Sequence, residues 1–238
     1  MSNPDTPKAP VAPRQAMLHI GPLKLTGVSA QLVLLAILGG IVWLIVRAKP
    51  WVNPSPLWLS GVLWVVFQVY WSVAASSASM ATRSESAKSR AVHQYLFLAS
   101  IVLLFAHIPG LRWQFLPRSA TSVLAGLAIQ VLSLWFAIAA RRALGRHWSG
   151  EITAKVDHEL IRTGPYAFAR HPIYTDIIGM FAGTAVVSGE LHALAGAVLI
   201  IYAYLRKIRL EERELARTFG DTYEQYRRET RALIPWVL

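Results

Sequence analysis

Residues 172–205 read PIYTDIIGMFAGTAVVSGELHALAGAVLIIYAYL, two apolar runs separated by a short turn at Ser188-Gly189-Glu190. Apolar runs of this length predict helices, and a connection of a few residues makes the two helices antiparallel neighbours. The runs, about 172–187 and 191–205, are shorter than the roughly 20 residues that span a hydrocarbon core, so the sequence leaves open whether both cross fully. We predict a helical hairpin in a membrane.

Four more apolar segments precede this hairpin. The chain has 238 residues, of which 54% are apolar and 16% charged, and its mean hydropathy is +0.40. Together with the long apolar runs, these values are typical of a polytopic membrane protein. We therefore predict an all-α fold, a membrane helical bundle of about six spans. The first four spans are expected at about residues 29–46, 57–75, 91–108 and 120–140.

The chain divides into three expected regions. Residues 1–27 contain seven prolines or glycines and lack the features of a signal peptide, which predicts a disordered or interfacial tail. Residues 28–140 form a four-helix transmembrane region. Residues 141–238 contain the hairpin, C-terminal amphipathic helices and most of the motifs that suggest chemistry.

The net charge is +11, and 20 of the 24 Lys and Arg residues fall on one side of the membrane if the N-terminus is cytoplasmic. The positive-inside rule then predicts that both termini are cytoplasmic, and in a bacterium the membrane would be the inner (plasma) membrane. Anionic lipids explain the charge better than nucleic acid, because no basic stripe interleaves with exposed aromatic residues. The chain has no cysteine, which excludes disulfides and cysteine-bound metals, and we expect no metal site.

The strongest chemical motif lies directly before the hairpin and includes Gly164-Pro165-Tyr166 and Arg170-His171-Pro172-Ile173-Tyr174. Gly-Pro marks a turn, and proline suits the first turn of a helix. Arg170 and His171 then precede a helix N-terminus, where backbone donors and the positive dipole end favour an anionic group. Such an arginine can also simply reach lipid phosphate, but the combined motif favours a functional site.

A second motif, Arg209-Leu210-Glu211-Glu212-Arg213-Glu214-Leu215, follows the hairpin. The helix of the second run is expected to continue to about Thr218. Its spacing places Glu212 on the apolar face, where a solvated glutamate is not expected. Glu211 fits either a site or a surface pair with a nearby basic residue, and Glu214 fits a surface pair.

Other candidates have two readings each. His147 and Trp148 follow the fourth span in a basic loop, which suits an interfacial anchor or the rim of a site. Tyr223 and Tyr226 share one helical face, which suits packing or closure over a site. Asp176 lies about one turn into the fifth helix, where the helix dipole alone favours a carboxylate.

The ordered motifs over residues 140–238 resemble the isoprenylcysteine carboxyl methyltransferase family. They run Gly164-Pro165-Tyr166, Arg170-His171-Pro172-x-Tyr174, Glu211-Glu212-x-x-Leu215, Phe219-Gly220-x-x-Tyr223-x-x-Tyr226 and Ile234-Pro235. That family belongs with the phospholipid methyltransferases among integral-membrane methyltransferases. It commonly has glycine two residues after the motif tyrosine, where this chain has Asp176.

The resemblance implies a methyltransferase that uses S-adenosyl-L-methionine, held in a cytoplasmic pocket of residues 141–238, with a lipophilic acceptor that enters from the bilayer. The favoured acceptor is the carboxylate of an isoprenoid or prenylcysteine-like compound; a phospholipid or other amine is the alternative. A carboxylate is already ionised near neutral pH, so an arginine that balances its charge is expected. The expected cofactor-binding residues are Tyr166, Arg170, His171, Pro172, Tyr174, Glu211 and Glu212; the catalytic candidates are Arg170, Arg209 and Glu212; and the substrate-binding candidates are His147, Trp148, Tyr223 and Tyr226.

Two other classes of protein fit parts of the sequence. Sterol-type membrane reductases, which use NADPH, share a similar RHP-x-Tyr arrangement, although Asn commonly follows the proline where this chain has Ile173. A non-catalytic membrane or transport protein is the second alternative. It is disfavoured because no charged residue lies in the middle of the first four expected spans.

Overall fold

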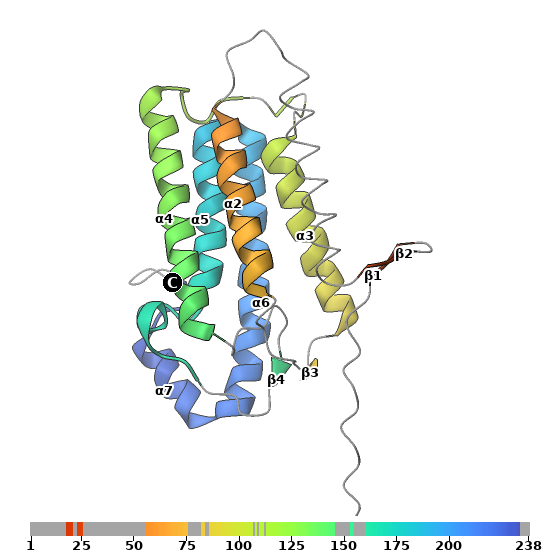
Figure 1. Cartoon of the computed structure of the whole chain (residues 1–238), viewed down its shortest axis with the longest axis vertical. Coiled ribbons are helices and arrows are strands. Elements are labelled where there is room, and N and C mark those ends of the chain that lie inside the picture. The colour runs from red at the N-terminus through yellow and green to blue at the C-terminus, as the bar shows by residue number, and fades with distance from the viewer. Residues whose placement is uncertain are drawn as a thin grey trace, which may run out of the picture.

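The computed structural model describes residues 56–75, 82–83, 86–106, 108, 110–111, 113–145, 153–154 and 160–233, and the backbone of 18–20 and 23–25. The described part is a bundle of long helices, with short strand pairs at its margins (Figure 1). This confirms the predicted all-α membrane fold. The helices are α2 (Leu57–Ala75), α3 (Ala87–Phe105), α4 (Ala120–Leu144), α5 (Pro172–Ser188), α6 (Leu191–Phe219) and α7 (Asp221–Glu229), with a 3₁₀ turn η2 (Gly164–Ala167); the strands β1 (Leu18–Ile20) and β2 (Leu23–Leu25) pair antiparallel, as do β3 (Thr82–Arg83) and β4 (Thr153–Ala154).

Three helices in the described part of the chain are long and apolar enough to cross a membrane: α2, α4 and α6. The helix α5, with 17 residues, is apolar but shorter. The span expected at 91–108 corresponds to α3, which begins earlier, at Ala87. Its first turns are polar, so it is not apolar enough to count as a fourth membrane-crossing helix. The span expected at 29–46 lies outside the described residues.

The predicted hairpin is present as α5 and α6, and Gly189 makes its turn with φ +69°. A Cβ atom there would lie 2.6 Å from the Leu116 carbonyl oxygen, so the turn needs glycine for both its conformation and its packing. The Gly189 carbonyl accepts hydrogen bonds from the Phe115 and Leu116 amides. The segment before α4 therefore holds the tip of the hairpin in place.

A buried ionic network supports the same turn. Glu190 accepts from Arg118 at 2.5 Å and lies 2.8 Å from His192 Nε2, and His192 Nδ1 lies 2.8 Å from the Leu103 carbonyl oxygen. Both Glu190 and His192 are buried. Because a buried charge is costly without partners, this network fixes how the hairpin meets α3 and the segment before α4.

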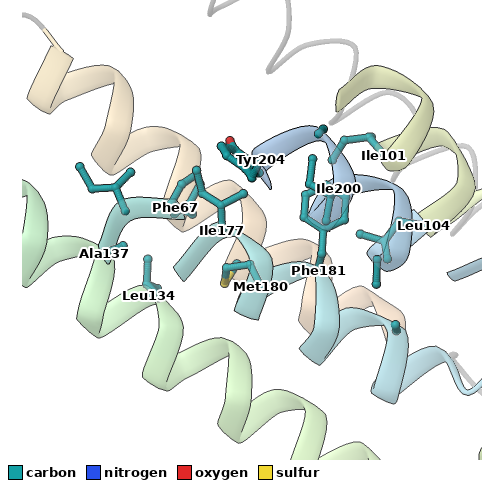
Figure 2. Packing of buried hydrophobic residues seen from close by; sticks show 14 of the residues in the cluster. Phe67, Ile101, Leu104, Leu134, Ala137, Ile177, Met180, Phe181, Ile200 and Tyr204 are labelled. Atoms are coloured by element: carbon teal, nitrogen blue, oxygen red, sulfur yellow. The ribbon is translucent and has the colours of Figure 1, made fainter. Parts of the chain in front are cut away.

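The core lies among α2, α3, α4, α5 and α6, and Figure 2 shows its buried side chains. A polar crosslink runs through it: Gln130 accepts from Ser60 and donates to Thr184, which also accepts from Trp64. Such side-chain hydrogen bonds and small residues join helices where lipid offers no hydrophobic drive. The labelled core residues are Phe67, Ile101, Leu104, Leu134, Ala137, Ile177, Met180, Phe181, Ile200 and Tyr204.

The helices α4 and α5 approach each other closely at Gly126 and Gly183. A Cβ atom on Gly126 would lie 2.6 Å from the Gly183 carbonyl oxygen and 2.8 Å from the Val187 amide nitrogen. We expect Gly126→Val to destabilise the bundle by roughly 3 kcal/mol, since two backbones would have to separate. Thermal unfolding in detergent measures this, with Ala125→Val on the exposed face of α4 as the matched control. Equal unfolding temperatures for the two variants would contradict the close approach.

The helix α6 changes character along its length. Its apolar part ends near Leu205, and the remainder extends past the ends of α2 and α5 and leads into α7 (Figure 1). Gly220 separates α6 from α7 with φ +51°. This extension, outside the membrane-crossing part, carries the second motif to the end of the bundle where α5 begins.

Candidate functional site

The segment before α5 is held by the C-terminal end of the chain. The amides of Arg170 and His171 donate to the carbonyls of Arg231 and Ala232, at 2.8 and 2.9 Å, and Ala169 forms a parallel bridge with Arg231. Pro172 then begins α5, as expected for a residue without an amide donor. Residues about 60 positions apart in the sequence thus fix the backbone of the RHP motif.

Arg170 joins the two motifs. Its Nε and Nη2 lie 2.8 and 2.7 Å from Glu212 Oε1, and its Nη1 donates to the carbonyls of Arg227 and Thr230. The side chains of Arg170 and Glu212 are 9% and 15% exposed, so this ion pair is largely shielded from water. Glu212 lies on the inward side of α6, as its helical spacing predicted.

Glu212 stays ionised at this position. Burial alone would raise its pKa, but the neighbouring His171 ring and the hydrogen bond and positive charge of Arg170 lower it to about 2. A carboxylate with this pKa is a poor proton acceptor near neutral pH. It is suited to binding a cation or a hydroxyl group.

His171 and Tyr174 form the second half of the cluster. Their rings stack with centroids 5.4 Å apart and planes 3° apart. The Tyr174 hydroxyl donates to Glu211 Oε2 at 2.6 Å, and His171 Nδ1 lies 3.7 Å from the same oxygen. His171 Nε2 is buried 3.4 Å from Glu212 Oε1 but has no partner in hydrogen-bond geometry among the described residues.

Three tyrosines close the cluster on the side of η2 and α7. Tyr226 donates to the carbonyl of Tyr166 at 2.6 Å and meets Tyr223 edge to face. Burial raises the pKa of Tyr226 to about 12, and burial together with the Glu212 charge raises the pKa of Tyr223 well above its usual value. Both phenols therefore keep their protons. The buried Tyr223 hydroxyl has no hydrogen-bond partner in the described part of the chain.

The structure brings together all seven predicted cofactor-binding residues and both tyrosines of α7. Three of the catalytic and substrate-binding candidates are not among them. Arg209 is exposed on α6, so its side chain is not part of the buried cluster. His147 and Trp148 lie outside the described residues. The gathered residues are Tyr166, Arg170, His171, Pro172, Tyr174, Glu211, Glu212, Tyr223 and Tyr226.

Sequence reasoning missed His93, Tyr204 and Lys207. The Tyr204 ring lies 4.8 Å from the Tyr174 ring and 5.1 Å from the His93 ring, and Lys207 Nζ lies 5.3 Å from the centre of the Tyr174 ring. Two signals were available: a histidine in a membrane helix is costly and often functional, and Lys207 precedes Glu211 by one helical turn.

Asp176 is almost fully buried in α5. Its Oδ1 accepts from the Ile177 amide at 2.7 Å, whereas its Oδ2 has no hydrogen-bond partner among the described residues. The helix dipole, which alone would suit an exposed carboxylate, does not explain this burial. A glycine at this position would leave no buried carboxylate oxygen without a partner.

Comparisons with known proteins agree with the fold and the motifs. A family model described as phospholipid methyltransferase matches residues 121–222. Methanethiol S-methyltransferase 1 from Bradyrhizobium diazoefficiens is 45% identical over 71 residues, which cover 30% of this chain and 24% of that protein. Protein-S-isoprenylcysteine O-methyltransferase from Schizosaccharomyces pombe is 34% identical over 82 residues, covering 34% of this chain and 35% of that protein.

A solved structure shares the fold over most of the chain. It is the eukaryotic intramembrane Ras methyltransferase (isoprenylcysteine carboxyl methyltransferase), with a TM-score of 0.56 and 20% identity, covering 85% of this chain and 75% of that one. The chain is an integral membrane protein. Its residues 121–222 are similar to the phospholipid methyltransferases, and parts of the chain are similar to isoprenylcysteine O-methyltransferases. The chain spans about a quarter and a third of the length of the two curated relatives named above.

Proposed function

We propose that this chain is a methyltransferase of the membrane that uses S-adenosyl-L-methionine and acts on a lipophilic acceptor. The observation that supports it best is the buried pairing of Arg170 with Glu212, which unites two motifs some forty residues apart beside the stacked His171 and Tyr174. The proposed catalytic region is residues 141–238, with residues 28–140 as the membrane bundle. The distribution of Lys and Arg supports a cytoplasmic position for both chain termini and for the cluster.

The residues present fit this cofactor. S-adenosylmethionine carries an ammonium, a carboxylate, a ribose diol and an adenine ring, and the cluster offers a complement to each kind of group. Two buried polar atoms, His171 Nε2 and the Tyr223 hydroxyl, also have no hydrogen-bond partner in the described residues, as expected where a ligand would satisfy them. NADPH would bring several phosphate charges, and the ionised Glu212 and neighbouring Glu211 are unfavourable to them.

Each residue of the cluster then has a role. Arg170 would hold the carboxylate of the cofactor, and Glu211 and Glu212 its ammonium or ribose hydroxyls. Tyr166, His171 and Tyr174 supply flat faces and hydrogen bonds, and Pro172 fixes the start of α5. When bound, the cofactor supplies a methyl group activated by a sulfonium.

The acceptor favoured by this chemistry is the carboxylate of an isoprenoid or prenylcysteine-like compound. A carboxylate needs no general base, so the chain has only to exclude water, hold the oxygen in line and balance its charge. Tyr223 and Tyr226, at the closed side of the cluster, help to exclude water. Arg170 is the buried arginine that suits charge balance, whereas the exposed Arg209 suits it less.

An amine acceptor is less favoured, because an ammonium must lose a proton before it can be methylated. Glu212, one of the catalytic candidates from the sequence, would have to act as that base, and its pKa of about 2 makes it unsuitable. A thiol is a second candidate acceptor, since the methanethiol S-methyltransferase named above has 45% identity to the matched segment.

The chemistry can be tested with the purified full chain, labelled S-adenosylmethionine and a membrane lipid extract. The expected product is a lipophilic methyl ester, which mass spectrometry identifies and which mild alkali hydrolyses with release of labelled methanol. A labelled N-methyl or S-methyl product that resists alkali would overturn the carboxylate acceptor but keep the methyltransferase. No labelled lipid, together with no cofactor binding, would overturn both.

A further inference from the structure

At the end of the bundle opposite the cluster, residues 113–118 run across the tip of the hairpin; we call this segment the clasp. The carbonyl of Trp113 accepts a hydrogen bond from the Leu191 amide at 2.9 Å, and the Phe115 amide donates to the Gly189 carbonyl at 2.9 Å. These bonds tie the clasp to the turn between α5 and α6. Its backbone is therefore held in one position relative to the bundle.

The ion pair at the same turn strengthens this attachment. Arg118, at the end of the clasp, pairs with Glu190 and donates from Nε to the Ser188 carbonyl at 3.3 Å. Gln114 forms an antiparallel bridge with Glu190. The clasp is thus fixed by side chains as well as by backbone bonds.

This fixed segment carries large apolar side chains on its surface. Trp113 is 77% exposed and Phe115 is 37% exposed, and the nearby Leu111 is exposed as well. Leaving such side chains in water is unfavourable, because apolar surface is stabilised when it is removed from water. Since the backbone is held by the hairpin, these side chains cannot reach the core by local rearrangement. They need an environment outside the protein.

The position of the clasp indicates which environment this is. The membrane-crossing helices α4 and α6 begin directly beside it, at Ala120 and Leu191. Trp58, in the first turn of α2 at the same end of the bundle, is also exposed (Figure 1). This end is where the helices leave the hydrocarbon core, and a tryptophan ring favours that level because its body is apolar and its N–H is polar.

The length of α5 gives such an anchor a purpose. Its 17 residues extend over about 26 Å, less than the roughly 30 Å of a hydrocarbon core. A short span does not define its own depth, so groups at its ends decide where it lies. The RHP motif is at the opposite end of α5 from the clasp, so an anchor at the hairpin tip also fixes the depth of that motif.

We propose that the clasp is a membrane anchor, with Trp113 and Phe115 inserted among the phospholipid headgroups at the interface opposite the cluster. The occupant of this surface is the interfacial layer of the bilayer, not a second copy of the chain or another protein. The apolar surface is small and lies beside Gln114 and the charged Arg118, as suits a layer that is partly apolar and partly wet. This role does not depend on the methyl-transfer chemistry of the proposed function.

The absence of cysteine from the chain makes the test direct, because Trp113→Cys creates a single site for the fluorescent label NBD. The labelled full chain is placed in phosphatidylcholine vesicles that carry a nitroxide either on the headgroup or in the middle of the acyl chain. The headgroup nitroxide should quench the label about twofold more strongly than the acyl-chain nitroxide, since aromatic anchors lie at headgroup depth.

Three further single-cysteine variants calibrate the depth. Leu132→Cys, at an exposed position halfway along α4, should show the reverse order of quenching. Arg217→Cys, exposed on the part of α6 beyond its apolar segment, should be quenched little by either lipid. Leu111→Cys keeps Trp113 and should give the same order as Trp113→Cys, so it decides the matter if the loss of Trp113 disturbs folding.

The possible outcomes are distinct. Labels at positions 111 and 113 that behave like the one at 217 would show that the clasp lies in water and overturn the proposal. Labels that are shielded from water but quenched by neither lipid would reveal a protein contact and also overturn it. Stronger quenching by the acyl-chain nitroxide would place the clasp inside the hydrocarbon core, which contradicts an interfacial anchor. Each of these results leaves the binding of S-adenosylhomocysteine, and with it the proposed function, to its own test.

Discussion

Replacing Arg170 with alanine is expected to lower the affinity for S-adenosylhomocysteine by about a hundredfold or more. The change leaves the buried, ionised Glu212 without its main partner and releases the carbonyls of Arg227 and Thr230 at the end of α7. Breaking a buried ion pair from one side typically costs about 3–5 kcal/mol, which corresponds to at least a hundredfold in binding if the site depends on the pair. Isothermal titration of the purified variant in detergent measures the loss.

Two further variants show whether the loss comes from the charge and geometry of Arg170 itself. Arg170→Lys keeps the charge but not the forked geometry, so we expect intermediate affinity. Arg217→Ala, at an arginine whose side chain is 78% exposed, should bind as wild type does. If Arg170→Ala retained wild-type affinity and a normal unfolding temperature, the Arg170–Glu212 pair would not be part of a cofactor site.

The second large effect is expected for Glu212→Gln, in both binding and acid stability. Because the pKa of Glu212 is about 2 in the folded chain and ordinarily 4.5, its ionised form stabilises the fold above about pH 4.5, and this contribution is lost as the pH falls toward 2. The variant has no such group, so its unfolding temperature should fall less steeply over that range. Its affinity for S-adenosylhomocysteine should fall by about tenfold or more, because Arg170 loses its counter-charge.

Glu214→Gln is the matched control for this experiment. Glu214 lies on the same helix and makes a surface pair with Arg217, and such pairs contribute little. The fall of its unfolding temperature at low pH and its affinity for S-adenosylhomocysteine should match those of wild type. Parallel acid profiles for wild type and Glu212→Gln would show that Glu212 is not held ionised by Arg170 and His171.

Local patterns in the sequence were sufficient to identify the two motifs and the side of the helix on which Glu212 lies. Proline at a helix start placed Arg170 and His171, and helical spacing turned Glu212 inward; the structure brings these residues into contact. The shared face of Tyr223 and Tyr226 was also visible from spacing, and both are buried. These features depend on residues within a few helical turns of each other, so the sequence carries them directly.

Contacts between distant segments had no comparable signal. The bond from Tyr226 to the carbonyl of Tyr166 and the pairing of Arg170 with Arg231 depend on how the chain end folds back onto η2. The approach of His93 to Tyr204 depends on the rotation of α3 against α6, which hydropathy does not specify. Arg209 shows that closeness in sequence is not sufficient either, because it lies three residues before Glu212 but its side chain is exposed outside the cluster.

The central claim is that the cluster of Arg170, His171, Tyr174, Glu211 and Glu212 holds S-adenosylmethionine. Titration of the purified wild-type chain with S-adenosylhomocysteine and, separately, with NADPH tests it most directly. We predict saturable binding of S-adenosylhomocysteine with one site per chain and no response to NADPH. Saturable binding of NADPH with no response to S-adenosylhomocysteine would contradict the assignment and favour a membrane reductase.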